Sequence, residues 1–173
     1  MEKDDVPVTA VPSNINGHGD LGLARGFIDY EADLLDRIEY ETWLELWAPE
    51  GHYIVPIDRQ QTDYANRLNH IYDDSVMRKQ RVERLLSGHA PSANPIMRTV
   101  RMAGRVRLLE AQPDRLIVSS SLMVVSYKRQ VQTLLAADVM HDLVRGEDGL
   151  KIAQKRVLLI NSDEPLSEMS FLL

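Results

Sequence analysis

Four residues of this chain could perform acid–base chemistry: Asp33, Asp138, His141 and Asp142. A carboxylate or imidazole enclosed by apolar groups can act as a general acid or base, because desolvation shifts its pKa. Side chains alternate between the two faces of a strand, so His141 points away from Asp138 and Asp142 unless a bulge intervenes. Asp33 has Arg37 four residues later, the spacing of a helical ion pair. We therefore expect structural roles for these side chains and no catalytic residue in this chain.

The sequence also argues against a metal or cofactor site. It contains no cysteine, which excludes disulfides, thiolate nucleophiles, zinc–sulfur sites and an iron–sulfur cluster held by this chain. A non-haem iron site needs two histidines and a carboxylate that converge on one point. The five histidines lie in separate predicted segments, and no two have the spacing of helical ligands: His18, His52, His70, His89 and His141. We predict no metal-binding and no cofactor-binding residue.

The composition predicts one globular domain that binds neither nucleic acid nor membranes. The 173 residues are 44% hydrophobic and 27% charged, with a formal net charge of -6 at pH 7. A binder of nucleic acid needs a basic surface. No apolar run approaches the roughly 20 residues that span a bilayer, and residues 1–20 have no apolar core of the kind a signal peptide needs. We expect a cytoplasmic protein.

Helical periodicity dominates the first half of the chain. Residues 1–22 are rich in proline, asparagine and glycine and show no sustained period, so we expect a flexible N-terminal arm before a single domain over residues 23–173. Apolar residues then recur every three or four positions. This pattern predicts helices over about 23–38, 39–48 and 73–87.

Local signals refine these elements. Asp73 or Asp74 should cap the third helix, and its Met77, Leu85 and Leu86 should face inward. A strand is predicted over 52–57, and the polar residues 58–69 predict a long loop, as do the two prolines of 89–95. The aromatic residues near the first two helices are expected to fill the core: Phe27, Tyr40, Trp43, Trp47 and Tyr53.

From Met97 the hydrophobic period changes to two, which is typical of strands. Val100, Met102, Val106 and Leu108 alternate with arginines, and turn signals at 112–114 and 146–149 separate further strands over 115–129, 131–145 and 150–161. Strands this long stay together when the sheet is strongly twisted. The order of elements predicts an α+β domain, a cystatin-like or NTF2-like (nuclear-transport-factor-2-like) cone. In it a strongly curved antiparallel sheet wraps around the N-terminal helices.

Arginines cluster in the first of these strands. The alternation places Arg101, Arg105 and Arg107 on one face, just after Arg98. They could form a solvated face with local ion pairs. They could equally form a subunit interface, because arginine is enriched at interfaces and pairs with carboxylates.

The chain closes on the apolar residues Phe171, Leu172 and Leu173. We expect this segment to dock as an added strand or to plug an interface. Phe171 and Leu172 therefore join the four arginines as candidate subunit-interface residues.

Several short blocks in a fixed order resemble one family, the small (beta) subunits of bacterial aromatic-ring-hydroxylating dioxygenases, which belong to the Rieske non-haem iron oxygenases. The blocks are Glu31-Ala32-Asp33-Leu34-Leu35-Asp36, Tyr40-Glu41-Thr42-Trp43-Leu44, Gly51-His52-Tyr53-Ile54-Val55-Pro56, Tyr72-Asp73-Asp74, Arg81-Val82-Glu83-Arg84-Leu85, Asn94-Pro95, Arg98-Thr99, Gly149-Leu150-Lys151-Ile152-Ala153, Arg156-Val157-Leu158-Leu159-Ile160-Asn161 and Glu168-Met169-Ser170-Phe171-Leu172.

The resemblance implies a structural role in aromatic compound catabolism. Such subunits have the cone fold, associate as trimers and support three larger alpha subunits. The alpha subunits hold the Rieske 2Fe–2S cluster and the mononuclear iron. Because the same fold also hosts catalytic members and small-ligand binders, a stand-alone isomerase or dehydratase with an acid/base residue in the cone, or a binding module, stays open as an alternative.

Overall fold

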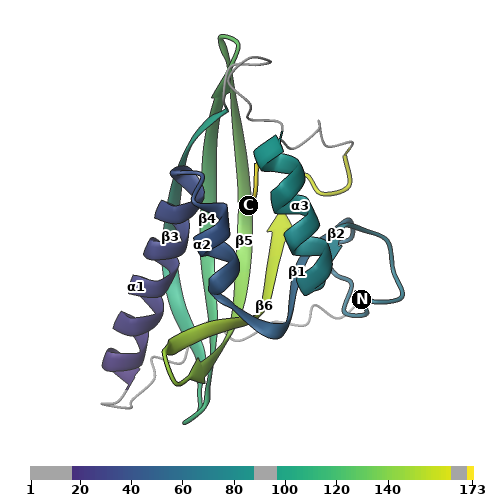
Figure 1. Cartoon of the computed structure of the whole chain (residues 1–173). Helices are drawn as coiled ribbons and strands as arrows, with labels where there is room; N and C mark the ends of the chain where they lie inside the picture. The colour runs from purple at the N-terminus through teal and green to yellow at the C-terminus, as the bar shows by residue number, and fades with distance from the viewer. Residues whose placement is uncertain (1–16, 88–96, 165–170) are drawn as a thin grey trace.

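A computed structural model describes residues 17–87, 97–164 and 171–173, and of residues 17 and 18 the backbone alone. Helices and a sheet form two layers, with the helices on one face of the sheet (Figure 1). The elements are α1 (Gly17–Asp36), α2 (Tyr40–Glu45), β1 (Trp47–Pro56), β2 (Asn69–Asp73), α3 (Ser75–Ser87), β3 (Arg98–Ala111), β4 (Arg115–Lys128), β5 (Val131–Gly146) and β6 (Gly149–Leu159).

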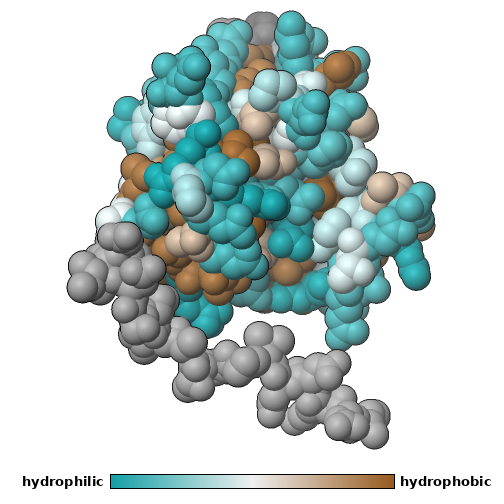
Figure 2. Space-filling view, turned by 90° about the horizontal axis from the view of Figure 1, so that it is seen from below, coloured by the Kyte–Doolittle hydropathy of each residue, from teal (hydrophilic) through white to brown (hydrophobic). Residues whose placement is uncertain are grey.

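The sheet has six strands in the order β2-β1-β6-β5-β4-β3. Every neighbouring pair is antiparallel except β1 and β6, which run parallel. The prediction of a curved α+β cone is confirmed, with the correction that the sheet is mixed. Helix α1 packs against β3, and α3 packs against β1. Seen from below, hydrophilic residues cover much of the molecule and hydrophobic residues gather in patches between them (Figure 2).

The first helix begins earlier than predicted. Helix α1 starts at Gly17, so residues 17–22 belong to the helix and not to a flexible arm, whereas residues 1–16 lie outside the described part. Asp20 in the first turn favours a helix N-terminus and pairs with Arg145 of β5. Leu21 packs against the core. These tertiary contacts offset the low helix propensity of the glycines.

The aromatic residues fill the core as predicted. Helix α2 ends at Glu45, so Trp47 opens β1 and does not continue the helix. The rings of Trp43, Trp47 and Tyr53 meet edge to face, with centroids 5.3–6.0 Å apart. Tyr40 is buried beside them, and Phe27 is partly buried. This cluster joins α2 to the first strand.

The third helix has the predicted cap. Asp74 accepts a hydrogen bond from the backbone N–H of Met77 at 2.9 Å, which satisfies one of the free amides of the first turn. Leu85 and Leu86 pack against the core, but Met77 is exposed, so its predicted inward orientation is wrong. Strand β2 was not predicted; it begins at the last residue of the predicted loop 58–69. Its five residues are too few to show a period.

The faces of β3 are reversed relative to the prediction in the part of the strand before Arg105, whereas Val106 is buried as expected. Arg101 is buried, whereas Val100 and Met102 are 63% and 68% exposed. Arg105 has a φ of 52° at a register shift between Gly104 and Arg107, the mark of a β-bulge. Because a bulge adds one residue, the alternation changes phase there. Arg101 therefore does not share a face with Arg105 and Arg107.

Candidate functional site

Three of the four predicted acid–base residues, the aspartates, pair with arginines, and none of them forms a dyad with His141. Asp33 pairs with Arg37 at 2.8 Å, as expected from its spacing. Asp138 pairs with Arg59 at 2.8 Å on the outer side of the sheet. Asp142 binds the guanidinium of Arg115, with 2.7 Å between Oδ1 and Nε. Only His141 faces the interior of the cone, so the predicted separation of His141 from the two aspartates is confirmed.

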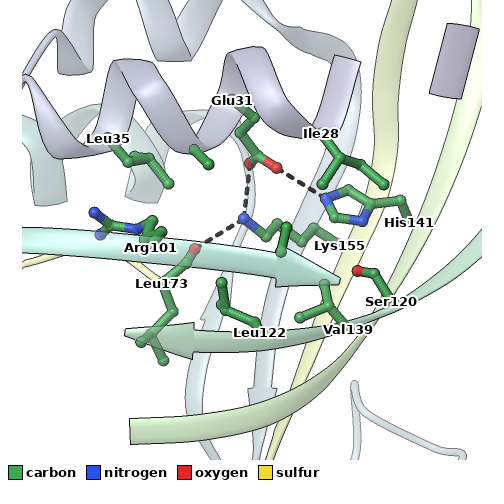
Figure 3. A pocket seen from close by; sticks show the side chains of 12 residues that line it. Ile28, Glu31, Leu35, Arg101, Ser120, Leu122, Val139, His141, Lys155 and Leu173 are labelled. Carbon is green, nitrogen blue, oxygen red and sulfur yellow. Dashed lines mark hydrogen bonds and ion pairs between the residues drawn. The ribbon is translucent and has the colours of Figure 1, made fainter. Parts of the chain in front are cut away.

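The interior of the cone holds a buried cluster of three charged or polar side chains: Glu31 of α1, His141 of β5 and Lys155 of β6 (Figure 3). Glu31 Oε1 accepts a hydrogen bond from Lys155 Nζ, and Glu31 Oε2 bonds to His141 Nε2, each at 2.8 Å. Trp43 Nε1 donates to Glu31 Oε1 at 2.9 Å. Because His141 and Lys155 are cross-strand partners, their side chains point to the same face and meet the helix above it.

The pKa shifts in this cluster favour an ion pair between Glu31 and Lys155. Burial by itself raises the pKa of Glu31, but the nearby Lys155 and His141 outweigh that effect and hold the pKa well below its usual range. Burial lowers the pKa of Lys155, and the charge of Glu31 opposes that shift. A general base needs a pKa near the working pH. The shift of Glu31 goes the other way, so the arrangement does not suit it as a base at neutral pH.

The last three residues fill the rest of the interior. Phe171, Leu172 and Leu173 are all buried. The space beside Glu31, His141 and Leu173 is a cavity of about 20 Å³. That volume holds a water molecule, whereas a small-molecule site needs several hundred Å³. The segment is buried within its own chain but forms no strand, so the predicted added strand is wrong, and a role at an interface stays a prediction.

Among the described residues, no group of three or more histidine, cysteine, aspartate or glutamate side chains is placed to hold a metal ion. His52 lies against Tyr72, with ring centroids 5.3 Å apart. His70 Nε2 lies 2.7 Å from the carbonyl oxygen of Ser162. The side chains of His18 and His89 lie outside the described part of the chain. Across that same part, no helix is both long and apolar enough to cross a membrane.

The six predicted interface residues divide into two groups. Arg101, Phe171 and Leu172 are buried within the chain. Arg98, Arg105 and Arg107 are exposed, and the guanidinium of Arg98 lies 5.0 Å from the ring centroid of Tyr127. Contact of these residues with another subunit stays a prediction.

The reversed faces of β3 create an apolar patch that the sequence analysis missed. Two rows of cross-strand neighbours lie side by side on the outer face of the sheet: Val100, Val125 and Leu134, and Met102, Met123 and Ala136. Val100, Met102, Met123 and Leu134 are between 44% and 68% exposed. We call these six residues the outer apolar patch.

Glu31 and Lys155 were also missed. Glu31 lies three residues after Ile28 and four before Leu35, within the apolar stripe of α1. A charged residue inside such an apolar stripe indicates a buried ion pair, and this could have been predicted from the sequence. Lys155 likewise precedes the buried residues Val157 and Leu159 at strand spacing.

The fold and its occupied interior define the class of this protein: a small α+β cone whose interior is largely filled by its own ion pair and C-terminal residues. Residues 30–163 match the model of the ring hydroxylating beta subunit family. The small oxygenase component of the p-cumate 2,3-dioxygenase system of Pseudomonas putida is 30% identical over 132 residues, 75% of this chain and 73% of that protein. The benzene 1,2-dioxygenase subunit beta of Pseudomonas putida is 27% identical over 84% of each chain.

Among solved structures, the beta subunit of benzoate 1,2-dioxygenase from Burkholderia mallei superposes with a TM-score of 0.73 at 21% identity, covering 86% of this chain and 95% of that one. This similarity supports the fold. The chain belongs to the family of ring-hydroxylating beta subunits.

Proposed function

We propose that this chain is the non-catalytic, structural small subunit of an aromatic-ring-hydroxylating dioxygenase, and that three copies form a base for larger alpha subunits. The observation that carries the proposal is the filled cone. Both oxygens of Glu31 are engaged by neighbouring side chains, and the adjoining cavity of about 20 Å³ is too small for an aromatic ring. The oxygen chemistry then belongs to the partner.

The proposal places the Rieske cluster and the mononuclear iron in the alpha subunit. A Rieske centre needs two cysteines and two histidines, and this chain has no cysteine. The relatives in Pseudomonas putida are components of dioxygenases, which supports a partner of that kind. The cytoplasmic location stays a prediction.

The outer apolar patch is the surface that we propose to lie between copies of the chain. Exposed apolar groups that lie together mark contact surfaces more often than isolated ones. Met102 is the most exposed member of the patch, at 68%. Arg98 and Tyr127, which contact each other, lie on β3 and β4, two of the strands that carry the patch. A ring of three copies would cover this surface on each copy.

Purification of the tagged chain from its native host, grown on aromatic carbon sources, tests the role. We expect a larger partner in equal amount, with iron and the absorbance of a Rieske cluster in the eluate. Recovery of the chain alone and without iron, although the candidate partner is expressed, would contradict the structural role and revive the stand-alone enzyme.

Native mass spectrometry of the isolated chain tests self-association. We expect three times the mass of one chain, and loss of that species in Met102→Glu, because a charge in the apolar patch is costly to bury. Met77→Glu changes an exposed methionine on α3 instead and serves as the control. A trimer that survives Met102→Glu would exclude the patch as the contact between copies.

A further inference from the structure

The C-terminal residues are held by side chains from three strands, in the way that a protein holds a ligand. Leu172 O accepts a hydrogen bond from the guanidinium of Arg101 on β3. Leu173 O accepts one from Lys155 Nζ on β6 at 2.9 Å and one from the Tyr53 hydroxyl on β1 at 3.3 Å. The Tyr53 hydroxyl in turn accepts the N–H of Leu173 at 3.0 Å.

Two of these donors are positioned by contacts that do not involve the C-terminal residues. Lys155 Nζ is anchored by Glu31 Oε1 at 2.8 Å. Arg101 is paired with Asp36 of α1, and its Nη1 donates to Thr99 Oγ1 at 2.8 Å. The donors are therefore expected to stay in place when Phe171–Leu173 are removed, as in a pre-organised binding site.

The remaining wall of this site is mainly apolar, with Glu31, Ser120 and His141 as its polar members. Leu173 borders the cavity of about 20 Å³, together with Ile28, Leu35, Leu122 and Val139 (Figure 3). Leu172 and Leu173 are each 1% exposed, so their side chains occupy interior space. Removal of three large buried residues, of which Leu173 lines the cavity, would enlarge it towards the size of a small-molecule pocket, about 300–1,000 Å³.

We propose that the interior of the cone is a binding pocket for a short apolar group with an acceptor oxygen, and that Phe171–Leu173 are its tethered occupant. Arg101, Lys155 and Tyr53 supply the hydrogen-bond donors. Arg101 holds one acceptor oxygen, and Lys155 and Tyr53 hold a second. The second can be the oxygen of an amide or of a carboxylate, since both accept hydrogen bonds from these donors. A tethered occupant acts at an effective concentration in the millimolar range, so the pocket is blocked in the intact chain.

The test uses a chain that ends at Ser170 and two probes, N-acetyl-Phe-Leu-Leu as the free acid and as the amide. Circular dichroism reports whether the shortened chain folds. Isothermal titration calorimetry and the shift in Tm report binding. We expect one saturable site for at least one probe and a Tm that rises towards that of the intact chain. The difference between the two probes shows whether the pocket selects a neutral or a charged acceptor.

A tyrosine pair locates the binding site. In the shortened chain, Tyr53→Phe removes the hydroxyl that both donates to and accepts from Leu173, and we expect about tenfold weaker binding of the probe. Tyr30→Phe removes an exposed hydroxyl on α1 and should leave the affinity unchanged.

Each outcome decides the proposal. A folded shortened chain that binds neither probe at millimolar concentration overturns it, and so does binding that Tyr53→Phe leaves unchanged. A shortened chain that is unfolded alone but folds when a probe is added supports it. One that stays unfolded with both probes overturns it, because the pocket then does not exist apart from its own C-terminal residues.

Discussion

Replacement of Glu31 by glutamine tests the central ion pair of the cone. Glu31→Gln keeps the size of the side chain and an oxygen that can accept from Lys155 and Trp43, but it removes the negative charge. Lys155 is 3% exposed, and its ammonium group is then left with only the neutral glutamine and the oxygen of Leu173 as partners. A buried cation without its counter-charge is strongly destabilising.

The expected magnitude follows from that burial. Loss of one partner of a buried ion pair costs about 3–5 kcal/mol. Because glutamine preserves an acceptor, we expect the lower end, about 3 kcal/mol. For a domain of this size each kcal/mol shifts Tm by about 2–4 °C, so Tm should fall by about 6–12 °C.

Urea unfolding followed by tryptophan fluorescence measures the free energy of unfolding, since Trp43 and Trp47 lie in the core. Asp33→Asn, two residues further along α1, is the matched control. It breaks an exposed pair with Arg37, and we expect a change within about 0.5 kcal/mol. In the double variant Glu31→Gln with Lys155→Met, both charges are absent, so the loss should be smaller than in Glu31→Gln alone.

A loss below about 1 kcal/mol in Glu31→Gln, or a larger loss in the double variant than in the single one, would refute the assignment of Glu31 and Lys155 as a buried, mutually required pair.

Three further predictions concern pH and backbone packing. The pKa of Glu31 is lowered in the folded state, so the stability that its charge contributes is complete above the unfolded pKa of about 4.3 and is lost as the pH falls further. The difference in free energy of unfolding between the natural chain and Glu31→Gln should therefore narrow at pH 3. An unchanged difference would count against the lowered pKa. Gly51→Ala places a Cβ 2.6 Å from the carbonyl oxygen of Ile152 and should lower the free energy of unfolding, measured in urea, by about 1–3 kcal/mol. Gly26→Ala on α1 has open space around the new Cβ and should raise the free energy of unfolding by about 0.5–1 kcal/mol. Arg78→Met removes the cation that donates to the carbonyl of Gly51 and should lower the free energy of unfolding by about 1–3 kcal/mol; a loss below 0.5 kcal/mol would show that water replaces it.

Much of the fold was predictable because its signals are local. The Asp74 cap and the turns at 112–114 and 146–149 each depend on a few residues that are neighbours in the sequence. The phase of β3 was not predictable in this way. The bulge at Arg105 depends on pairing with β4, and Arg101 is tolerated inside because Asp36, 65 residues earlier, neutralises it. An alternating pattern alone therefore grouped Arg101 wrongly with Arg105 and Arg107 on one face.

The interior cluster depends even more on tertiary structure. Glu31 and Lys155 are 124 residues apart, and their contact requires the side chain of a helix packed on β3 to meet that of a residue on β6 inside the cone. The sequence did separate His141 from Asp138 and Asp142 correctly, because that inference needs only strand geometry. It did not supply a partner for His141, since the partner comes from a helix at the other end of the chain.

The pairing of the interior charges favours a structural role for these side chains over a catalytic one. A catalytic carboxylate must offer a free lone pair to its substrate, with a pKa near the working pH. Here both oxygens of Glu31 already accept hydrogen bonds, from Lys155, Trp43 and His141. The ring nitrogen of His141 that bonds to nothing among the described residues is Nδ1, and the cavity beside that ring has room for water alone. The same groups that could serve a reaction in an open cone instead hold α1, the sheet and the C-terminal residues together.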